Sequence, residues 1–428
     1  MTCDMASKNA FLDPLYGEQT LGESAEALAR QPVIQRLRHV RLSNIDSVGM
    51  PGIANVSRYE HSVGTALLAA KVGFRTRLSS VEREILEAAA LMHDSAIPPF
   101  GHLVEEAFAY VSAGVDHESR WSLIFANPGG HEVGGINLQI FLGRQAGIWS
   151  WAEKTFGNDA GTALAEILAT SRGNGKFGKC ICGDLDLDNL DNVVRAAFHM
   201  GIEVDRLLPV RIAEAMTDVD PRRGVVFRAD AKSLIQTWLD VRKQVYGRFM
   251  LSRPDFVGKV MLIAATVEAY KRGLFTQRDW MLTDSAFLER LLAARHKEVS
   301  EPVANWLCGE LWPLSELVWM DGQAPSYPPV YEFSQVLSKG LNRTCMAYAI
   351  KDKRFRALHF ETSSGGAVDL GSATGRWLLG VCSSLRRCFG DVENKKIADY
   401  ASKFFGTHCI GEADPWGTSE LGTPSLFQ

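Results

Sequence analysis

Apolar side chains recur at spacings of three and four along most of the first 300 residues, which is the pattern of amphipathic helices. Residues 25–42 and residues 61–77 carry this pattern. Clean alternation of apolar and polar residues is rare before residue 300. In that part of the chain, residues 225–232 predict a short strand. Further helices are predicted at about 101–112, 117–126, 133–142 and 160–171, in the later part of 184–202, and over most of 231–298.

The helix predicted at 82–94 has recognisable ends. Ser79 precedes it, with Glu82 three positions later, which is the pattern of a capping box at a helix start. Two prolines at 98–99 then force an extended or turned segment. The helix therefore delivers a His-Asp pair at its C-terminal end.

After about residue 300 prolines and tryptophans cluster, and long helical patterns become fewer. Residues 347–364 predict two strands, and residues 372–405 predict a return to helix. We expect a mostly α fold: a helical-bundle core at 26–300 after an irregular lead-in at 1–25, a smaller α+β C-terminal region at 301–412, and a flexible tail at 413–428.

Composition adds limits on partners and compartment. The chain has 428 residues, of which 46% are hydrophobic and 22% charged, and its net charge is −4. This charge argues against coating nucleic acid, so no bulk nucleic-acid binding is expected. The eight cysteines form no C-x-x-C pair, which favours reduced thiols in a cytosol. Neither a signal-peptide pattern nor an apolar run of about 18 residues is present, so we expect a cytoplasmic protein without a membrane span.

Histidines and acids form a candidate metal site. His61 lies early in one predicted helix, the pair His93 and Asp94 closes another, and Asp188 lies in an acidic helix start about ninety residues later. Imidazole nitrogen and carboxylate oxygen suit Mn, Fe, Co, Ni, Zn or Mg. Two His and two Asp leave coordination positions open, which is typical of a catalytic rather than a structural site.

Several motifs then resemble a known family. RYEHSVG, LMHDSAIPPFGHLVEE, DHES and DLDLDNLDNVVRAAFHMGI occur in this order. They resemble the HD-domain phosphohydrolases, and the branch most like this chain is the deoxynucleoside triphosphate triphosphohydrolase (dNTPase) type. QRLRHVRLSNIDSVGMPGI and MLTDSAFLERLL are similar to flanking segments of that branch. The resemblance covers roughly residues 25 to 300 and implies a helical fold.

The resemblance also implies roles for individual residues. One divalent metal ion is expected on His61, His93, Asp94 and Asp188. His117 matches a histidine that acts on the leaving group or the attacking water, and histidine is well suited to move a proton near neutral pH. Other expected contributors are Glu118, which could orient His117; His102 and Glu105, a polar pair beside the metal; and Arg58 and Arg195 on the substrate.

Departures from the family pattern concern the substrate. Ile97 stands where triphosphohydrolases usually have a histidine, Asn189 replaces a basic residue, Asn192 a tyrosine and Ala196 an aspartate, while Arg195 is kept. These positions are expected to hold sugar and triphosphate. A diverged specificity is therefore predicted, for another nucleotide, a monophosphate or a modified phosphoester.

Other expectations remain open. Lys176 could contact phosphate, or it is a solvated loop charge. Some HD proteins bind two metals and catalyse phosphodiester or oxidative chemistry, which here would require His117 and His131 as ligands. A third hypothesis is a nucleotide-sensing regulatory protein without turnover. The expected partners are a nucleotide or small phosphorylated substrate and possible further copies of the chain in a homo-oligomer.

Overall fold

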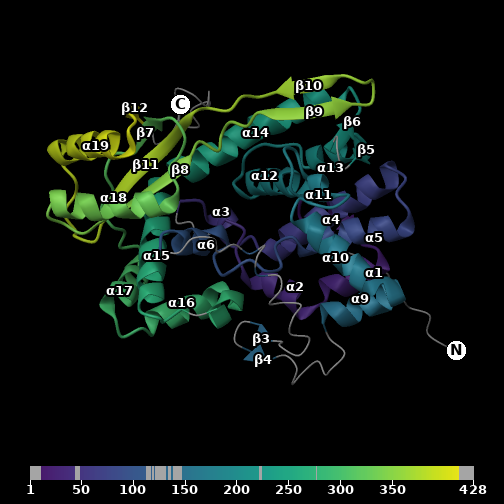
Figure 1. The fold of residues 1–428 in the computed structure, drawn as a ribbon, viewed down its shortest axis with the longest axis horizontal. Helices are drawn as coiled ribbons and strands as arrows, with labels where there is room; N and C mark the ends of the chain where they lie inside the picture. Colours follow the sequence, from purple (N-terminus) through teal and green to yellow (C-terminus); the bar gives the residue numbers. More distant parts are fainter. Residues whose placement is uncertain are drawn as a thin grey trace.

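The computed structural model describes residues 11–43, 49–111, 117, 120, 132–133, 136–137, 147–220, 224–275 and 277–413. The described chain is mostly helical, with small sheets toward the C-terminus, as expected (Figure 1). The helix expected at 117–126 lies largely outside the described residues, as do Glu118 and His131. Where a helix was expected from 133, the described residues instead form paired strands, β3 (Glu132–Val133) and β4 (Ile136–Asn137).

Three helices carry the candidate metal ligands. Helix α4 (Arg58–Arg75) packs against α5 (Ser80–Met92) and α12 (Leu187–His199). The capping box on α5 is confirmed, because the Ser79 hydroxyl accepts from the Glu82 amide and the Glu82 carboxylate accepts from the Ser79 amide. Helix α10 (Ala160–Ser171) lies where the sequence predicts it and packs against α5.

The N-terminal part differs from the expectation. The predicted irregular lead-in contains a hairpin of β1 (Phe11–Asp13) and β2 (Gly17–Gln19). The continuous helix predicted over residues 25–42 is broken into α1 (Glu23–Ala29), α2 (Pro32–Arg36) and a 3-10 turn. Proline starts a helix well but cannot continue one, which explains the break at residue 32.

Two four-stranded sheets form from the later sequence. The first has the order β12 (Cys409–Glu412), β7 (Val318–Asp321), β11 (Arg376–Ser383), β8 (Cys345–Lys351). The helix predicted from residue 372 is wrong over β11, because a buried apolar run fits a central strand as well as a helix. The remainder of that segment does form α19 (Asp391–Phe405).

The second sheet joins distant parts of the chain. Its order is β10 (Ala367–Leu370), β9 (Leu358–Thr362), β6 (Gly224–Phe227), β5 (Met216–Asp220), with β6 and β9 parallel. The strand predicted at 225–232 and the two predicted at 347–364 are therefore confirmed as β6, β8 and β9. Because this sheet pairs strands from both sides of residue 300, the expected domain boundary there does not divide the packing.

Two hydrophobic cores make up the interior. One contains side chains of α4, α5, α10, α12 and β9, and the other those of α6 (His102–Ala109), α15 (Arg253–Lys271), β8 and β11. Helix α14 (Ala231–Leu251) crosses between them, from the β5–β6–β9–β10 sheet toward α15 (Figure 1). The remaining helices are α3 (Pro51–Ala54), α9 (Ile148–Phe156), α11 (Gly178–Ile181), α13 (Leu208–Glu214), α16 (Asp284–Leu292), α17 (Lys297–Leu307) and α18 (Tyr327–Gly340).

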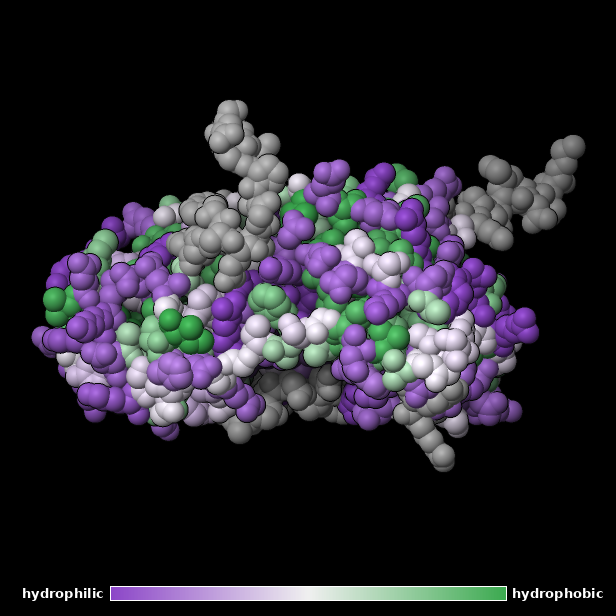
Figure 2. All heavy atoms as spheres, turned by 90° about the horizontal axis from the view of Figure 1, so that it is seen from above, coloured by the Kyte–Doolittle hydropathy of each residue, from purple (hydrophilic) through white to green (hydrophobic). Residues whose placement is uncertain are grey.

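The surface has a mixed character. On the face shown in Figure 2, hydrophilic and hydrophobic side chains are interspersed. Among the described helices, none combines the length and the apolar character needed to cross a bilayer.

Candidate metal centre

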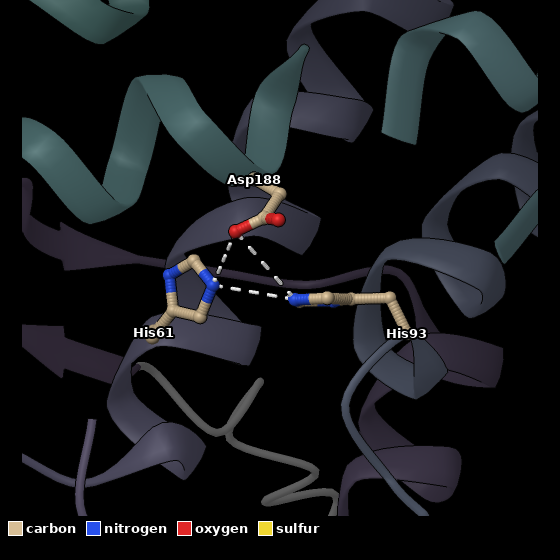
Figure 3. A group of neighbouring side chains, drawn as sticks. All are labelled: His61, His93 and Asp188. Atoms are coloured by element: carbon tan, nitrogen blue, oxygen red, sulfur yellow. Dashed lines mark hydrogen bonds and ion pairs between the residues drawn. The ribbon is translucent and has the colours of Figure 1, made fainter. Parts of the chain in front are cut away.

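Three predicted ligands meet at one point. His61 from α4, His93 at the C-terminal end of α5 and Asp188 from the first turn of α12 face one another (Figure 3). The two Nε2 atoms lie 3.2 Å apart, and His61 Nε2 lies 3.0 Å from Asp188 Oδ1. Both histidines are buried, whereas the Asp188 side chain keeps 34% of its surface exposed. The group could therefore hold a divalent ion with one side open.

Hydrogen bonds on the far side of each ring decide which nitrogen is free. His61 Nδ1 lies 2.7 Å from Asp191 Oδ2, and His93 Nδ1 lies 2.7 Å from the carbonyl oxygen of Ala90. Both partners are acceptors, so each Nδ1 carries the proton in the neutral ring and each Nε2 presents a lone pair. Two lone pairs and a carboxylate oxygen that face each other repel unless a cation lies among them. This donor set fits a divalent metal ion.

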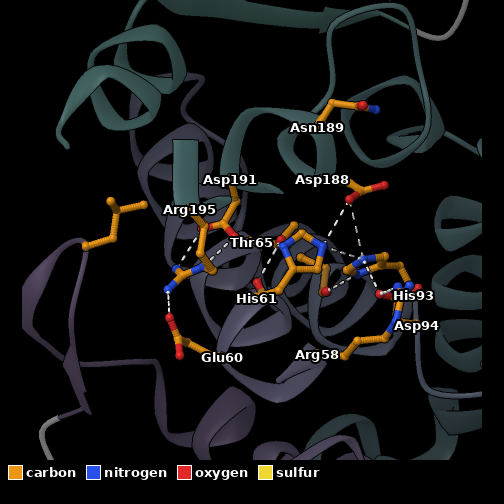
Figure 4. A network of polar contacts seen from close by, with 12 residues as sticks. Arg58, Glu60, His61, Thr65, His93, Asp94, Asp188, Asn189, Asp191 and Arg195 are labelled. Atoms are coloured by element: carbon orange, nitrogen blue, oxygen red, sulfur yellow. Dashed lines mark hydrogen bonds and ion pairs between the residues drawn. The ribbon is translucent and has the colours of Figure 1, made fainter. Parts of the chain in front are cut away.

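A buried ionic network holds His61 from behind. Asp191 accepts from Arg195 Nε at 2.9 Å and Nη2 at 2.8 Å (Figure 4). It also accepts from the Tyr16 hydroxyl at 2.8 Å. Arg195 also donates to Asp13 and Glu60. Burial opposes the imidazolium form, yet the Asp188 and Asp191 carboxylates raise the pKa of His61 to about 10. The hairpin at the N-terminus thus contributes to the support of a metal-facing histidine.

Close packing explains a glycine in the first motif. A Cβ on Gly64, one turn after His61, would lie 2.2 Å from Arg195 Nη2 and 2.2 Å from Asp191 Oδ1. Neither group can move away, because both belong to the buried network. Only glycine at this position lets α12 approach α4 so closely.

Asp94 is placed differently from the other three ligands. Its Oδ2 accepts from Arg58 Nη1 at 2.6 Å and lies 3.5 Å from His93 Nε2. Burial favours the neutral acid, but Arg58 and the nearby histidines hold the pKa of Asp94 well below its usual range. Asp94 is therefore an anion at the edge of the group, paired with Arg58, and both side chains line the cavity.

A second polar group stands near the first. Glu105 Oε1 accepts from the backbone amide of His117 at 2.6 Å and lies 2.8 Å from His117 Nδ1, while Glu105 Oε2 lies 2.6 Å from His102 Nδ1. Burial opposes charge on His117, but the Glu105 carboxylate raises the pKa of His117. With Nδ1 fixed on Glu105, Nε2 of His117 is left to exchange a proton. The predicted pair of His102 and Glu105 is therefore in contact, and Glu105 also contacts His117, for which the sequence predicted Glu118 as the partner.

Two predicted substrate contacts lie elsewhere. Arg195 has no exposed surface, and its guanidinium is enclosed by the carboxylates of Asp13, Glu60 and Asp191. It supports His61 and does not line the cavity. Lys176 forms an ion pair with Glu82 at the start of α5, far from the cavity lining. The alternative reading of Lys176 as a loop charge agrees with this position.

A cavity of about 240 Å³ opens beside the centre. Arg58, Asp94, His102 and Asp188 line it on one side. Of the four positions that depart from the family pattern, Asn189, Asn192 and Ala196 also line it, whereas Ile97 is buried in a small apolar cluster.

Side chains beyond the motifs complete the cavity wall. Tyr246 and Phe249 come from α14, Lys259 from α15 and Lys353 from the loop after β8. Sequence reasoning missed these residues, because no motif surrounds them and lysines and aromatics on helices usually belong to solvated faces or cores. Only the basic residues that follow β8 could have suggested a phosphate contact.

Comparison with known proteins supports the class of site. A family model described as the HD domain matches residues 58–126, which contain α4, α5 and α6. A solved phosphohydrolase from Bacteroides thetaiotaomicron aligns with 89% of this chain and all of its own, at a TM-score of 0.62 and 18% identity. That likeness shows a shared fold. The HD-domain part of the predicted resemblance is confirmed, whereas the dNTPase branch stays a prediction.

Relatives among curated proteins are distant. An uncharacterized protein of Methanocaldococcus jannaschii is 24% identical over 258 residues, which cover 60% of this chain and 49% of the relative. YwfO of Bacillus subtilis is 26% identical over 50% of this chain and 44% of its own length. YdhJ of the same organism is 24% identical over 67% of this chain and 76% of its own. The chain thus matches less than half of the first two relatives, and all three are uncharacterized.

Proposed function

We propose that the chain is a metal-dependent phosphohydrolase that acts on a nucleotide or a related phosphoester. One observation carries the proposal: the Nε2 atoms of His61 and His93 and an oxygen of Asp188 converge at the edge of a cavity that also contains cationic side chains. The HD-domain match over the same helices agrees with it.

The ligands in this proposal are His61, His93, Asp94 and Asp188. When bound, a divalent ion polarises a phosphoryl oxygen and lowers the pKa of water. Arg58 lines the cavity beside Asp94 and is placed to bind a phosphate oxygen. The ion pair with Asp94 fixes its guanidinium, so little side-chain entropy is lost on binding.

Proton transfer is assigned to His117. Hydrolysis breaks a P–O bond: water supplies hydroxide to phosphorus and a proton to the leaving oxygen. Glu105 keeps His117 protonated at Nδ1 and raises the pKa of His117, so its Nε2 can deliver the proton. His102, which shares Glu105, is placed to bind the same phosphate from the cavity wall.

Substrate specificity is proposed to differ from that of dNTPases. Asn189, Asn192 and Ala196 replace ionic and phenolic groups on the cavity wall with neutral ones. A triphosphate would lose charged contacts at these positions, so the contacts must come from elsewhere or the substrate must differ.

A metal analysis combined with a substrate screen tests the proposal. Purified protein should retain about one divalent ion per chain and hydrolyse at least one nucleotide or phosphoester, with phosphate, pyrophosphate and triphosphate release told apart. His93→Ala should lose both the ion and turnover, whereas the exposed His39→Ala should keep both. Turnover by metal-free His93→Ala protein would refute the proposal. A content near two ions per chain would favour the binuclear alternative.

A further inference from the structure

Two lysines from outside the sequence motifs line the cavity beside the metal centre. Lys259 lies in the second turn of α15, and Lys353 lies two residues beyond the end of β8. Both lie outside residues 58–126, which match the HD domain. We call these two residues the lysine wall.

Neighbouring groups hold Lys353 in place. Its backbone amide donates to Sδ of Met250 at 3.4 Å. The preceding residue, Asp352, is buried and accepts from Arg354 Nε at 3.0 Å and from Arg376 Nε at 2.9 Å. The loop is therefore held on both sides of Lys353, so its position does not depend on a ligand.

Neither ammonium group is satisfied within the described part of the chain. Lys259 Nζ has one hydrogen-bond acceptor there, the carbonyl oxygen of Phe249, at a long 3.4 Å. For Lys353 Nζ the same part of the chain offers no hydrogen-bond or ion-pair partner. A half-buried ammonium normally makes up to three hydrogen bonds, so both retain donors for something in the cavity.

The charges around the lysine wall are arranged to present cations to the cavity. Burial lowers the pKa of Lys259, while Asp255 and Glu106 favour its charged form and Lys353 opposes it. Neither carboxylate lines the cavity, and Glu106 is occupied by the Tyr348 hydroxyl at 2.7 Å. These acids thus favour the charged form of Lys259 without entering the cavity lining.

The acids on the opposite side of the cavity are already engaged. Asp94 is paired with Arg58, and Asp188 faces His61 and the metal position. They do not neutralise the lysine wall. An anion is the complementary occupant of the lysine wall, because two cationic side chains with few partners attract it.

We propose that Lys259 and Lys353 bind a second phosphate group of the substrate, so that the substrate class is compounds with at least two phosphate groups, one at the metal centre and one at the lysine wall. This inference rests on the proposed function. It also explains how a phosphorylated substrate is held although α12 has the neutral Asn189 and Asn192 where the family pattern has a basic residue and a tyrosine. Tyr246 and Phe249, on the same wall, give the organic part an apolar surface.

Binding of non-hydrolysable ligands tests the inference without turnover. The metal-loaded protein is titrated calorimetrically with methylenediphosphonate, which has two phosphonate groups, with methylphosphonate, which has one, and with phosphonoacetate, which has one phosphonate and one carboxylate. Methylenediphosphonate should bind at least tenfold more tightly than either of the others. Lys353→Met should reduce that preference about tenfold, because one charged hydrogen-bond donor is lost.

The matched control is Lys351→Met, which removes an exposed lysine two residues away that does not line the cavity. It should keep the wild-type preference. Because methylenediphosphonate can chelate the metal ion equally in every titration, this variant also shows how much of the preference is due to chelation. Lys259→Arg keeps a cation above Asp255 and should bind more like wild type than Lys353→Met. Metal content and thermal unfolding are measured for each variant.

Three results would overturn the inference: equal affinity for one and two phosphonates, an unchanged preference in Lys353→Met, or tighter binding of phosphonoacetate. A protein that binds methylenediphosphonate through the lysine wall but hydrolyses no substrate would refute only the proposed function. A protein that hydrolyses a phosphoester without any preference for two phosphates would refute only the lysine wall.

Discussion

The two sides of the cavity are built differently. On the metal side, His61, His93 and Asp188 come from helices that pack against each other, and buried hydrogen bonds fix the histidine rings. On the opposite side, Lys259 and Lys353 come from a helix and a loop and leave donors unused within the described residues. The metal side is held in place by buried hydrogen bonds and suits a cation, whereas the lysine wall keeps donors available for an anion.

This difference indicates which side of the cavity contributes to fold stability and which contributes to ligand specificity. Ligand geometry on the metal side depends on a buried ionic network, and damage to that network should affect folding and metal affinity together. The lysine wall contributes little to the fold, so its loss should affect ligand choice alone. Variants on the two sides can therefore separate the two roles.

The largest expected effect comes from Arg195→Met. Removing this side chain leaves the buried carboxylates of Asp13 and Asp191 without their cation, at a cost of about 3–5 kcal/mol in the free energy of unfolding. Lys353→Met should cost less than about 1 kcal/mol, because its ammonium lacks a partner in the described chain. Urea unfolding of both variants measures the contrast. Equal stability losses would contradict the distinction between the two sides.

A smaller effect is expected from Asp191→Asn. The amide cannot attract the His61 Nδ1 proton as a carboxylate does, so metal affinity should fall about 10–100-fold. Competition with a chelator of known affinity gives the value. The exposed Asp184→Asn, in the same acidic run, is the matched control and should bind metal like wild type. An unchanged affinity in Asp191→Asn would show that His61 needs no support from behind.

The smallest effect concerns pH. Glu105 raises the pKa of His117 against burial, so Glu105→Gln should lower that pKa. Because the proton donor must be protonated, activity falls as the pH rises through the pKa of His117. The high-pH limb of the kcat profile should therefore move to lower pH in Glu105→Gln. A high-pH limb that stays at the same pH would contradict the assignment of proton transfer to His117.

Local sequence was informative wherever a short segment decides its own structure. The capping box at Ser79 and Glu82 predicted the start of α5, which ends with His93 as its C-cap residue. The same reasoning was wrong at β11, because residues 376–383 are apolar enough for either a helix or a central strand. Their pairing with β7 and β8 decides the matter, and those strands lie far away in the sequence.

Arg195 shows the same limit within the site. Its motif predicted a substrate contact, but the side chain lies behind His61 because Asp13 and Glu60 approach it from other elements. Asp13 belongs to a hairpin in the segment that the sequence predicted as irregular.

By itself the sequence determined the helical class, the order of the metal-ligand candidates and the pairing of His102 with Glu105. These follow from helix periodicity, capping and residue chemistry, all of which act over a few positions. Only the tertiary structure decided what faces the metal, since the second core brings Lys259 and Lys353 across the cavity from residues more than sixty positions beyond Asp188. Lysines so far from the motifs in sequence reach the site only through tertiary packing, so no local sequence pattern predicts them.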